Sequence, residues 1–129
     1  MINVYQWHLN ESDAALLERD GWSASEKIYA YGGKGLAGTD LYKWFDEYKK
    51  VAVVDSDDFN ETWRLMNTWD EKSRVEKLER ECASLSVGDV LQKAGEFFLV
   101  DKFGFKKFCK TENGKPEAER LAAGFHSSN

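Results

Sequence analysis

The 129-residue chain has few of the residues that build linkers, disulfide frameworks and metal sites: it contains one proline, two cysteines and two histidines. No pair of cysteine or histidine residues falls at the spacing of zinc ligands, so we expect no bound metal. The single proline and the lack of proline-, glutamine- or serine-rich tracts argue against an interdomain linker. The length then predicts one domain that can bury a hydrophobic core without covalent staples.

Long apolar runs are also missing from the sequence. No run approaches the roughly 18 residues that a membrane-spanning helix needs. The first residues lack a basic region followed by an apolar one, which a secretory signal would require. Cys82 and Cys109 could form only one disulfide, and without a signal we expect both to be reduced thiols. The sequence therefore predicts a soluble, cytoplasmic protein.

The protein is acidic, but its charge is unevenly distributed. The formal net charge is −5. Residues 102–129 carry six basic and three acidic residues, a net +3, whereas the remainder carries 12 basic and 20 acidic residues, a net −8. An acidic body disfavours broad binding to duplex DNA. The basic C-terminal quarter leaves a narrower interaction with nucleic acid open.

Hydrophobic periodicity predicts an α+β fold, a single domain over residues 1–129 with a mostly antiparallel sheet and two or three helices packed on one face. We expect helices at 14–19, 41–48 and 59–66. We expect strands at 2–9, 28–31 and 50–54, and a three-stranded meander at 90–91, 97–100 and 105–108. Residues 70–83 stay open between helix and strand. We expect residues from about 111 to 129 to form a loosely attached helical or polar tail.

A glycine-rich segment begins at Gly33 and ends at Gly38, and it matches the dinucleotide-binding pattern G-x-G-x-x-G. It follows an expected strand, and Asp55, 22 positions after Gly33, could reach a ribose hydroxyl. However, the expected strand is short, the expected helix after the loop carries bulky Trp44, and too little chain follows for a doubly wound sheet. We favour a surface loop and keep nucleotide binding as a third hypothesis.

The segment 102–110 interleaves lysine with phenylalanine, as single-stranded nucleic-acid binders do. Part of it matches F-G-F-x-x-F, the kernel of an RNA-binding strand motif in which alternate aromatic rings stack on bases. The candidate binding residues are Lys102, Phe103, Phe105, Lys106 and Lys107. The motif's leading basic-glycine pair is absent. In the alternative interpretation, the phenylalanines face the core and the lysines protect a sheet edge.

A cluster of acids at Asp55, Asp57 and Asp58 could suggest a metal site or an acid-base pair. A calcium loop that began at Asp55 would need a glycine and a glutamate where the chain has Asn60 and Met66. A strand exit that caps the next helix explains the acids with fewer assumptions. No serine or cysteine lies in a nucleophile motif such as G-x-S-x-G. We therefore expect no enzyme and no cofactor.

Glycines mark the predicted turns of the C-terminal meander. We expect Gly88 to adopt a turn conformation, with Asp89 accepting hydrogen bonds from the turn backbone. Gly95 should turn the first hairpin, and Gly104 should relieve crowding or mark a bulge beside two phenylalanines.

The second half of the chain carries a longer pattern, whose most specific part is S-x-S-V-G-D-V at 84–90, followed by a strand and by G-F at 104–105. Its other parts lie at 48–55, 58–59, 66–67 and 98–100. The pattern resembles that of small uncharacterised accessory proteins carried by phages and plasmids. The resemblance implies a single α+β domain with no assigned activity and no catalytic residues. The charged stretch 74–81 departs from it, because the group runs extended there.

These observations lead to three hypotheses for function. The first is a non-enzymatic accessory protein of a mobile genetic element that binds a host or phage protein through exposed aromatic residues. The second is single-stranded nucleic-acid binding through the segment 102–110. The third is nucleotide binding at the loop 33–38.

Overall fold

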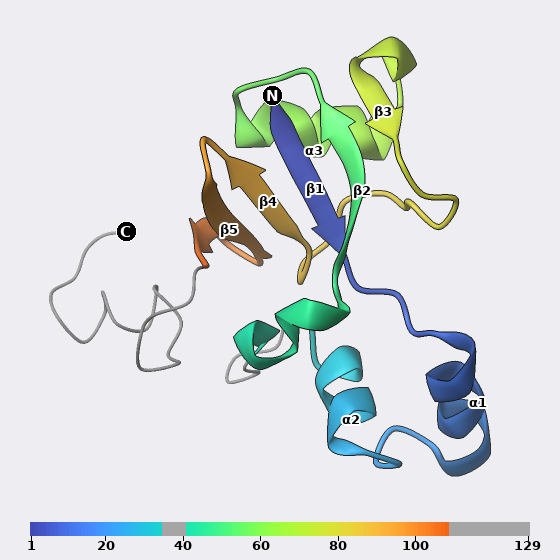
Figure 1. Ribbon diagram of the computed structural model, residues 1–129. Helices are drawn as coiled ribbons and strands as arrows, with labels where there is room; N and C mark the ends of the chain where they lie inside the picture. Colours follow the sequence, from blue (N-terminus) through green and yellow to red (C-terminus); the bar gives the residue numbers. More distant parts are fainter. Residues whose placement is uncertain (35–40, 109–129) are drawn as a thin grey trace, which may run out of the picture.

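A six-stranded antiparallel sheet organises the computed structural model, which describes residues 1–34 and 41–108 (Figure 1). The strands are β1 (Ile2–Gln6), β2 (Lys49–Val54), β3 (Val75–Lys77), β4 (Val90–Lys93), β5 (Glu96–Asp101) and β6 (Gly104–Lys107), in the spatial order β3-β2-β1-β4-β5-β6. The helices are α1 (Glu11–Asp20), α2 (Glu26–Gly32) and α3 (Phe59–Thr68), with 3₁₀ helices η1 (Leu41–Glu47) and η2 (Lys72–Arg74). The predicted α+β class and antiparallel sheet are confirmed.

Strand β1 occupies the centre of the sheet because both of its faces carry residues that the fold buries. Ile2, Val4 and Gln6 are buried on one face. Side chains alternate along a strand, so Tyr5 and Trp7 belong to the opposite face. β1 pairs antiparallel with β2 on one side and with β4 on the other. The N-terminal strand thus joins the β2–β3 pair to the meander of β4, β5 and β6.

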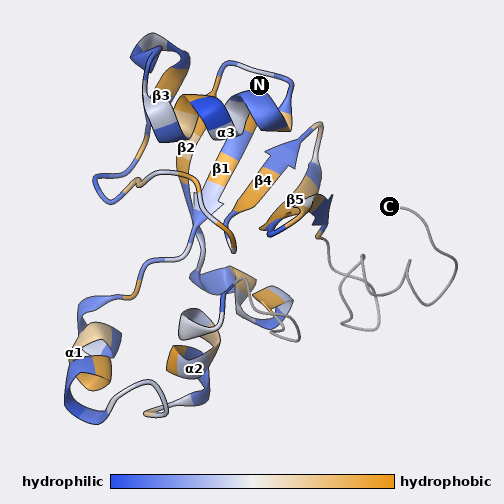
Figure 2. Ribbon diagram, turned by 180° about the vertical axis from the view of Figure 1, so that it is seen from behind, coloured by the Kyte–Doolittle hydropathy of each residue, from blue (hydrophilic) through white to orange (hydrophobic). Residues whose placement is uncertain are grey.

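Helix α3 covers the first face of the sheet and completes an aliphatic core (Figures 1 and 2). Asp58 caps the helix, since its side chain accepts a hydrogen bond from the backbone of Asn60. Leu65 and Met66 turn inward, and Figure 2 shows mainly hydrophilic residues on the outer side. The buried members of this core are Ile2, Val4, Val51, Ala52, Val54, Leu65, Met66, Val75, Cys82, Leu85, Leu91 and Val100.

The opposite face carries a second core, which is mostly aromatic and is covered by η1, with α2 packed against its edge at Trp7. Trp7 lies at its centre, with ring centroids of Tyr31, Tyr48 and Trp44 between 5.2 and 6.1 Å away. Its buried members are Trp7, Ala30, Leu41, Tyr42, Tyr48, Val90 and Phe108. The helices are therefore divided between the two faces, with α3 alone on the first, where we expected two or three together. The division follows from β1, which offers apolar side chains to both sides.

One expectation for local structure needs correction, and one open question is answered. The predicted strand at 28–31 is wrong, because these residues belong to α2. The side chain of Ser25 accepts a hydrogen bond from Ile28 N at 3.1 Å and starts a helix there. Residues 70–83, where composition favoured helix, form only η2, the edge strand β3 and an irregular connection. Backbone hydrogen bonds from Asp55 N to Arg74 O and from Leu78 N to Val51 O, both 2.8 Å, tie this segment to β2.

The other expected elements lie where the pattern placed them. The helix expected at 41–48 is the 3₁₀ helix η1, and the strand at 50–54, the helix at 59–66 and the C-terminal meander are confirmed. Cys82 is a free, buried thiol, and burial raises its pKa. The proposed tail at 111–129 and Cys109 lie outside the described residues.

Candidate functional site

A buried carboxylate, Asp89, lies immediately before β4 with only 3% of its surface exposed. Its Oδ2 accepts hydrogen bonds from Gln6 Nε2 at 3.0 Å and from Ser86 N at 2.9 Å. The second bond confirms the predicted role of Asp89 in the turn. Burial raises the pKa of Asp89 to about 6, because the hydrogen bonds and the positive charge of Lys34 only partly compensate for lost hydration.

Gln6 connects this carboxylate to the end of β1 and to the long connection before β4. Its Nε2 donates to Ala83 O at 3.0 Å as well as to Asp89, and its Oε1 accepts from Ala83 N at 3.0 Å. His8 Nε2 lies 3.0 Å from the same Oε1, and burial lowers the pKa of this histidine. Sequence analysis missed Gln6, although it falls on the buried side of β1, in alternation with Ile2 and Val4.

Lys34, which follows the Gly33 cap of α2, extends its side chain across the turn that contains Gly88. Its Nζ donates to Trp7 O at 3.0 Å and lies 4.3 Å from the ring centroid of Tyr31. Burial lowers the pKa of Lys34, and the negative charge of Asp89 opposes that shift. The hydroxyl of Tyr48 donates to Gly88 O at 2.6 Å. Lys34 thus fastens α2 to the end of β1 and to the 86–89 turn.

This buried polar cluster brings together residue types that enzymes also use, and shifted pKa values are frequent at functional sites. Here the polar groups form hydrogen bonds with one another and with nearby backbone atoms. Gln6 and Asp89 are each at most 3% exposed, and Tyr48 is 7% exposed. Such burial leaves little of their surface for a substrate to contact. The arrangement explains how the end of β1, α2 and the 86–89 turn are held together.

Gly88 allows the close approach of Lys34, and this dependence can be measured. Gly88 has φ +98°, and a Cβ placed on it would lie 2.7 Å from Lys34 Cβ. Gly95 also has a positive φ, +81°, but a Cβ at that position would have no atom within 4 Å. We expect Gly88→Ala to lower the free energy of unfolding by about 2–4 kcal/mol, and Gly95→Ala by about 1–2 kcal/mol from backbone strain alone. Equal losses in urea titrations would contradict the proposed packing of Lys34 on Gly88.

The two phenylalanines of the expected nucleic-acid motif lie in different environments. Phe103 lies in the turn between β5 and β6 and is 95% exposed. Phe105, on β6, is half-buried and packs against the aliphatic core, with its ring centroid 5.2 Å from that of Phe59. The structure therefore does not present them as two adjacent stacking platforms on one strand surface. Gly104 between them has φ +143°, a backbone conformation that glycine adopts readily.

The lysines of this motif lie on the hairpin formed by β5 and β6, where two of them have acidic partners. Lys106 Nζ is 3.5 Å from Asp101, and Lys107 Nζ is 3.2 Å from Glu96. Lys102 is exposed in the turn beside Phe103. Since β6 is an edge strand of the described sheet, these charges also lie where an edge needs protection.

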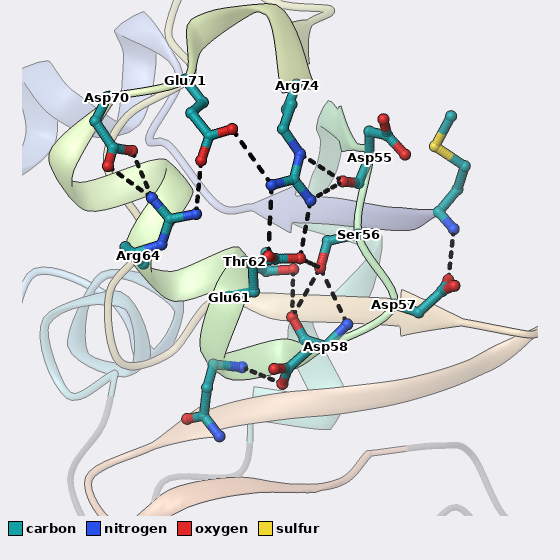
Figure 3. Close-up of polar contacts among 12 residues, drawn as sticks. Asp55, Ser56, Asp57, Asp58, Glu61, Thr62, Arg64, Asp70, Glu71 and Arg74 are labelled. Carbon is teal, nitrogen blue, oxygen red and sulfur yellow. Dashed lines mark hydrogen bonds and ion pairs between the residues drawn. The ribbon is translucent and has the colours of Figure 1, made fainter.

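The acids at 55–58 serve separate local contacts (Figure 3). Asp58 caps α3, as predicted. Asp57 Oδ1 lies 2.9 Å from the main-chain nitrogen of Met1, and Asp55 uses its backbone oxygen to accept from the Arg74 guanidinium at 2.7 and 3.1 Å. Within residues 1–34 and 41–108, no three side chains of His, Cys, Asp or Glu are grouped so that they could hold a metal ion.

Two arginines connect α3 to the segment that follows it (Figure 3). Arg74 pairs with Glu61 at 2.9 Å, and Arg64 pairs with Asp70 at 2.6 Å and with Glu71 at 2.9 Å. Each guanidinium therefore joins α3 to the segment that directly follows it in the sequence. These contacts orient η2 and β3 against α3, which is a structural role.

The glycine-rich loop is preceded by α2, whereas a dinucleotide-binding loop follows a strand. Gly33 and Lys34 are described, and the rest of the loop, 35–38, lies outside the described residues. Asp55 is exposed at the end of β2. The strand that a dinucleotide-binding motif requires before its glycines is therefore replaced by a helix, which weakens the hypothesis of nucleotide binding.

Apart from Phe103, the most exposed aromatic residues lie on the helical hairpin formed by α1 and α2. Tyr29 is 70% exposed and Trp22, between the helices, is 54% exposed. A Cβ on Gly32 would lie 2.4 Å from Trp22 Cε3, so the indole lies directly against the backbone of α2. Tyr29 precedes Gly32 by three residues, which places both on one side of the helix. We call Trp22, Tyr29 and the side of α2 between them the hairpin surface.

This hairpin lies beyond the end of the sheet at which β1 finishes (Figures 1 and 2). None of the α1 residues is buried. Lys27 of α2 connects to α1 through an ion pair with Asp13 at 2.5 Å and to η1 through an ion pair with Glu47 at 2.9 Å. Sequence analysis missed this surface because it expected a strand at 28–31; the Ser25-Glu26 capping pair was the available signal.

Comparisons of the chain with protein-family models, with curated proteins and with solved structures found no match. Among the helices of the described residues, none has the length and apolar character needed to cross a membrane. The fold and its surfaces therefore define the class: an α+β protein whose antiparallel sheet carries a helical hairpin at one end.

Proposed function

We propose that this chain is a non-enzymatic accessory protein, of the kind carried by phages and plasmids, that acts by binding a host or phage protein through the hairpin surface. The observation that carries the proposal is the exposure of Trp22 and Tyr29 on one side of α2. Tryptophan and tyrosine are enriched among the residues that dominate binding energy at protein interfaces. The S-x-S-V-G-D-V pattern at 84–90 supports the assignment to mobile elements.

The helix that flanks this surface supports the same proposal. A 10-residue helix is marginal in isolation, and α1 buries no residue of its own against the domain. Leu16 and Leu17 are half-buried, and Asp13 forms an ion pair with Lys27, so α1 adds no fully buried side chain to either core. A helical hairpin that presents aromatic side chains away from the sheet is suited to contact a second protein.

The proposal predicts that Tyr29→Ala removes partner binding while the fold persists. Since Tyr29 is 70% exposed, the substitution should change the free energy of unfolding by less than about 0.5 kcal/mol. We expect recovery of the specific partner from a lysate of the host to fall at least about tenfold, because truncation of an interface tyrosine commonly costs about 2 kcal/mol. The measurement is quantitative mass spectrometry of nuclease-treated pull-downs.

Phe103→Ala is the matched control for this experiment. It also removes one exposed ring, but from the β5–β6 turn. Under the proposal it leaves partner recovery unchanged. Equal recovery with wild type and Tyr29→Ala, or an equal loss with both variants, would contradict binding through the hairpin surface.

The alternative function, single-stranded nucleic-acid binding, has one specific observation in its favour: Phe103 is 95% exposed next to Lys102. A ring and an ammonium in one turn suit stacking on a base and contact with a phosphate. This function predicts that Phe103→Ala, and not Tyr29→Ala, abolishes binding to a labelled oligonucleotide. It also predicts affinity that falls steeply with salt concentration.

A further inference from the structure

The hairpin that carries Trp22 and Tyr29 is strongly acidic. From Glu11 to Gly32 it contains five carboxylates and two cations, a net charge of −3. Both cations are engaged within the fold. Lys27 lies between Asp13 and Glu47, and Arg19 pairs with its neighbour Asp20 at 3.2 Å. The aromatic side chains are thus presented in a negative electrostatic field.

Helical geometry places one of the acids, Glu26, on the same side of α2 as Tyr29. Glu26, Tyr29 and Gly32 follow at intervals of three residues and lie along one side of α2, with the Trp22 indole against Gly32. The side chain of Glu26 is 70% exposed and also pairs with Lys43 of η1. Glu18, in the last turn of α1, is exposed on the same helical hairpin. The hairpin therefore combines exposed aromatic side chains with exposed carboxylates.

We infer that the hairpin surface binds a basic, amphipathic segment of the partner protein. This inference rests on the proposed function and specifies the partner's chemistry. Apolar side chains of the segment pack on Trp22 and Tyr29, and its lysines or arginines lie against Glu18 and Glu26. Complementary charge selects such a partner and speeds its association, while the buried aromatic contacts supply most of the affinity. An amphipathic helix that presents one apolar stripe meets both requirements.

The test uses defined probes and the full chain. Two synthetic amphipathic helices share a leucine face and carry either lysine or glutamate on the other face. We expect the lysine peptide to bind the wild-type protein and the glutamate peptide not to bind, as measured by fluorescence polarisation. Glu18→Lys should weaken binding of the lysine peptide roughly fivefold to tenfold, because it places a like charge beside the segment.

Glu76→Lys supplies the matched control. It makes the same change in net charge on β3, which lies at the far end of the molecule from the hairpin (Figure 1). We expect this variant to bind the lysine peptide within about twofold of wild type, since distant surface charges are screened at physiological salt. Equal weakening by Glu18→Lys and Glu76→Lys, or equal binding of the two peptides, would overturn the inference.

The same variants separate this inference from the proposed function. Partner recovery from lysate that is lost with Tyr29→Ala but unchanged with Glu18→Lys would leave the proposed function standing and overturn the basic character of the partner. The proposed function and the basic character of the partner are both supported if Tyr29→Ala and Glu18→Lys each lose partner recovery. Phe103→Ala and Glu76→Lys must then leave recovery unchanged. Recovery that is unchanged with all four variants overturns both.

Discussion

Replacing Trp7 by alanine is expected to lower the free energy of unfolding by about 3–5 kcal/mol, the range observed when large aromatic residues are removed from protein cores. Trp7 is 1% exposed and is the largest fully buried side chain of the described residues. Since a typical domain has only about 5–15 kcal/mol of stability, this loss should place the variant close to unfolding at room temperature. Urea titration followed by circular dichroism measures the effect.

The size of the effect follows from the number of elements that meet at this ring. Trp7 directly follows β1 and contacts Tyr31 of α2, Trp44 of η1 and Tyr48, which precedes β2. Its backbone oxygen also accepts the hydrogen bond from Lys34. Removal of the ring therefore loosens the attachment of α2, and with it the position of the hairpin surface.

Trp63→Ala is the control for Trp7→Ala because it removes the same group from an exposed position. Trp63 lies on α3 and is 39% exposed. We expect a loss of at most about 1 kcal/mol. Similar urea midpoints for the two variants would show that the aromatic core does not depend on Trp7.

The second large effect concerns pH and the buried Asp89. Burial raises its pKa from an ordinary value of 3.8 to about 6, so between these values the folded state binds more protons than the unfolded state. Stability from this group is then fully present below pH 4 and falls as pH rises toward 6 and above. The expected loss is about 3 kcal/mol, since one pKa unit corresponds to about 1.4 kcal/mol.

Asp89→Asn should remove this pH dependence with little change in geometry. Both observed hydrogen bonds, from Gln6 and from Ser86, end on one oxygen, Oδ2, and an asparagine carbonyl can accept both. Between pH 4 and pH 7.5, the stability of the variant relative to wild type should therefore rise by about 2–3 kcal/mol. Urea titrations at the two pH values measure the difference.

Asp57→Asn is the control for the pH experiment. Asp57 is exposed, and its contact with the Met1 amine lowers its pKa, so the contribution of this contact is lost only as pH falls below 4. The variant should show the same change between pH 4 and pH 7.5 as the wild type. If Asp89→Asn behaves like Asp57→Asn, the Asp89 carboxyl is not titrating in a buried environment.

Local residue patterns were sufficient to predict the elements whose signals lie within a few residues. Alternation in β1, β-branched residues in β2 and the Asp58 cap of α3 each depend on neighbours within a few residues. The positive φ angles of Gly88, Gly95 and Gly104 likewise follow from a property of the single residue, its missing Cβ. For this reason the meander and the α+β class could be predicted without knowledge of any long-range contact.

Long-range contacts, in contrast, determine which polar and aromatic residues are exposed and which are buried. Tyr29 is exposed because Ser25 starts a helix in which Ile28 and Ala30 are buried and Tyr31 packs on Trp7. Asp89 has its raised pKa because the fold buries its carboxylate, and the hydrogen bond from Gln6, 83 positions earlier, offsets only part of that effect. Contacts across such separations depend on how the β1–β4 pair brings distant segments together, and no local pattern of residues encodes that geometry.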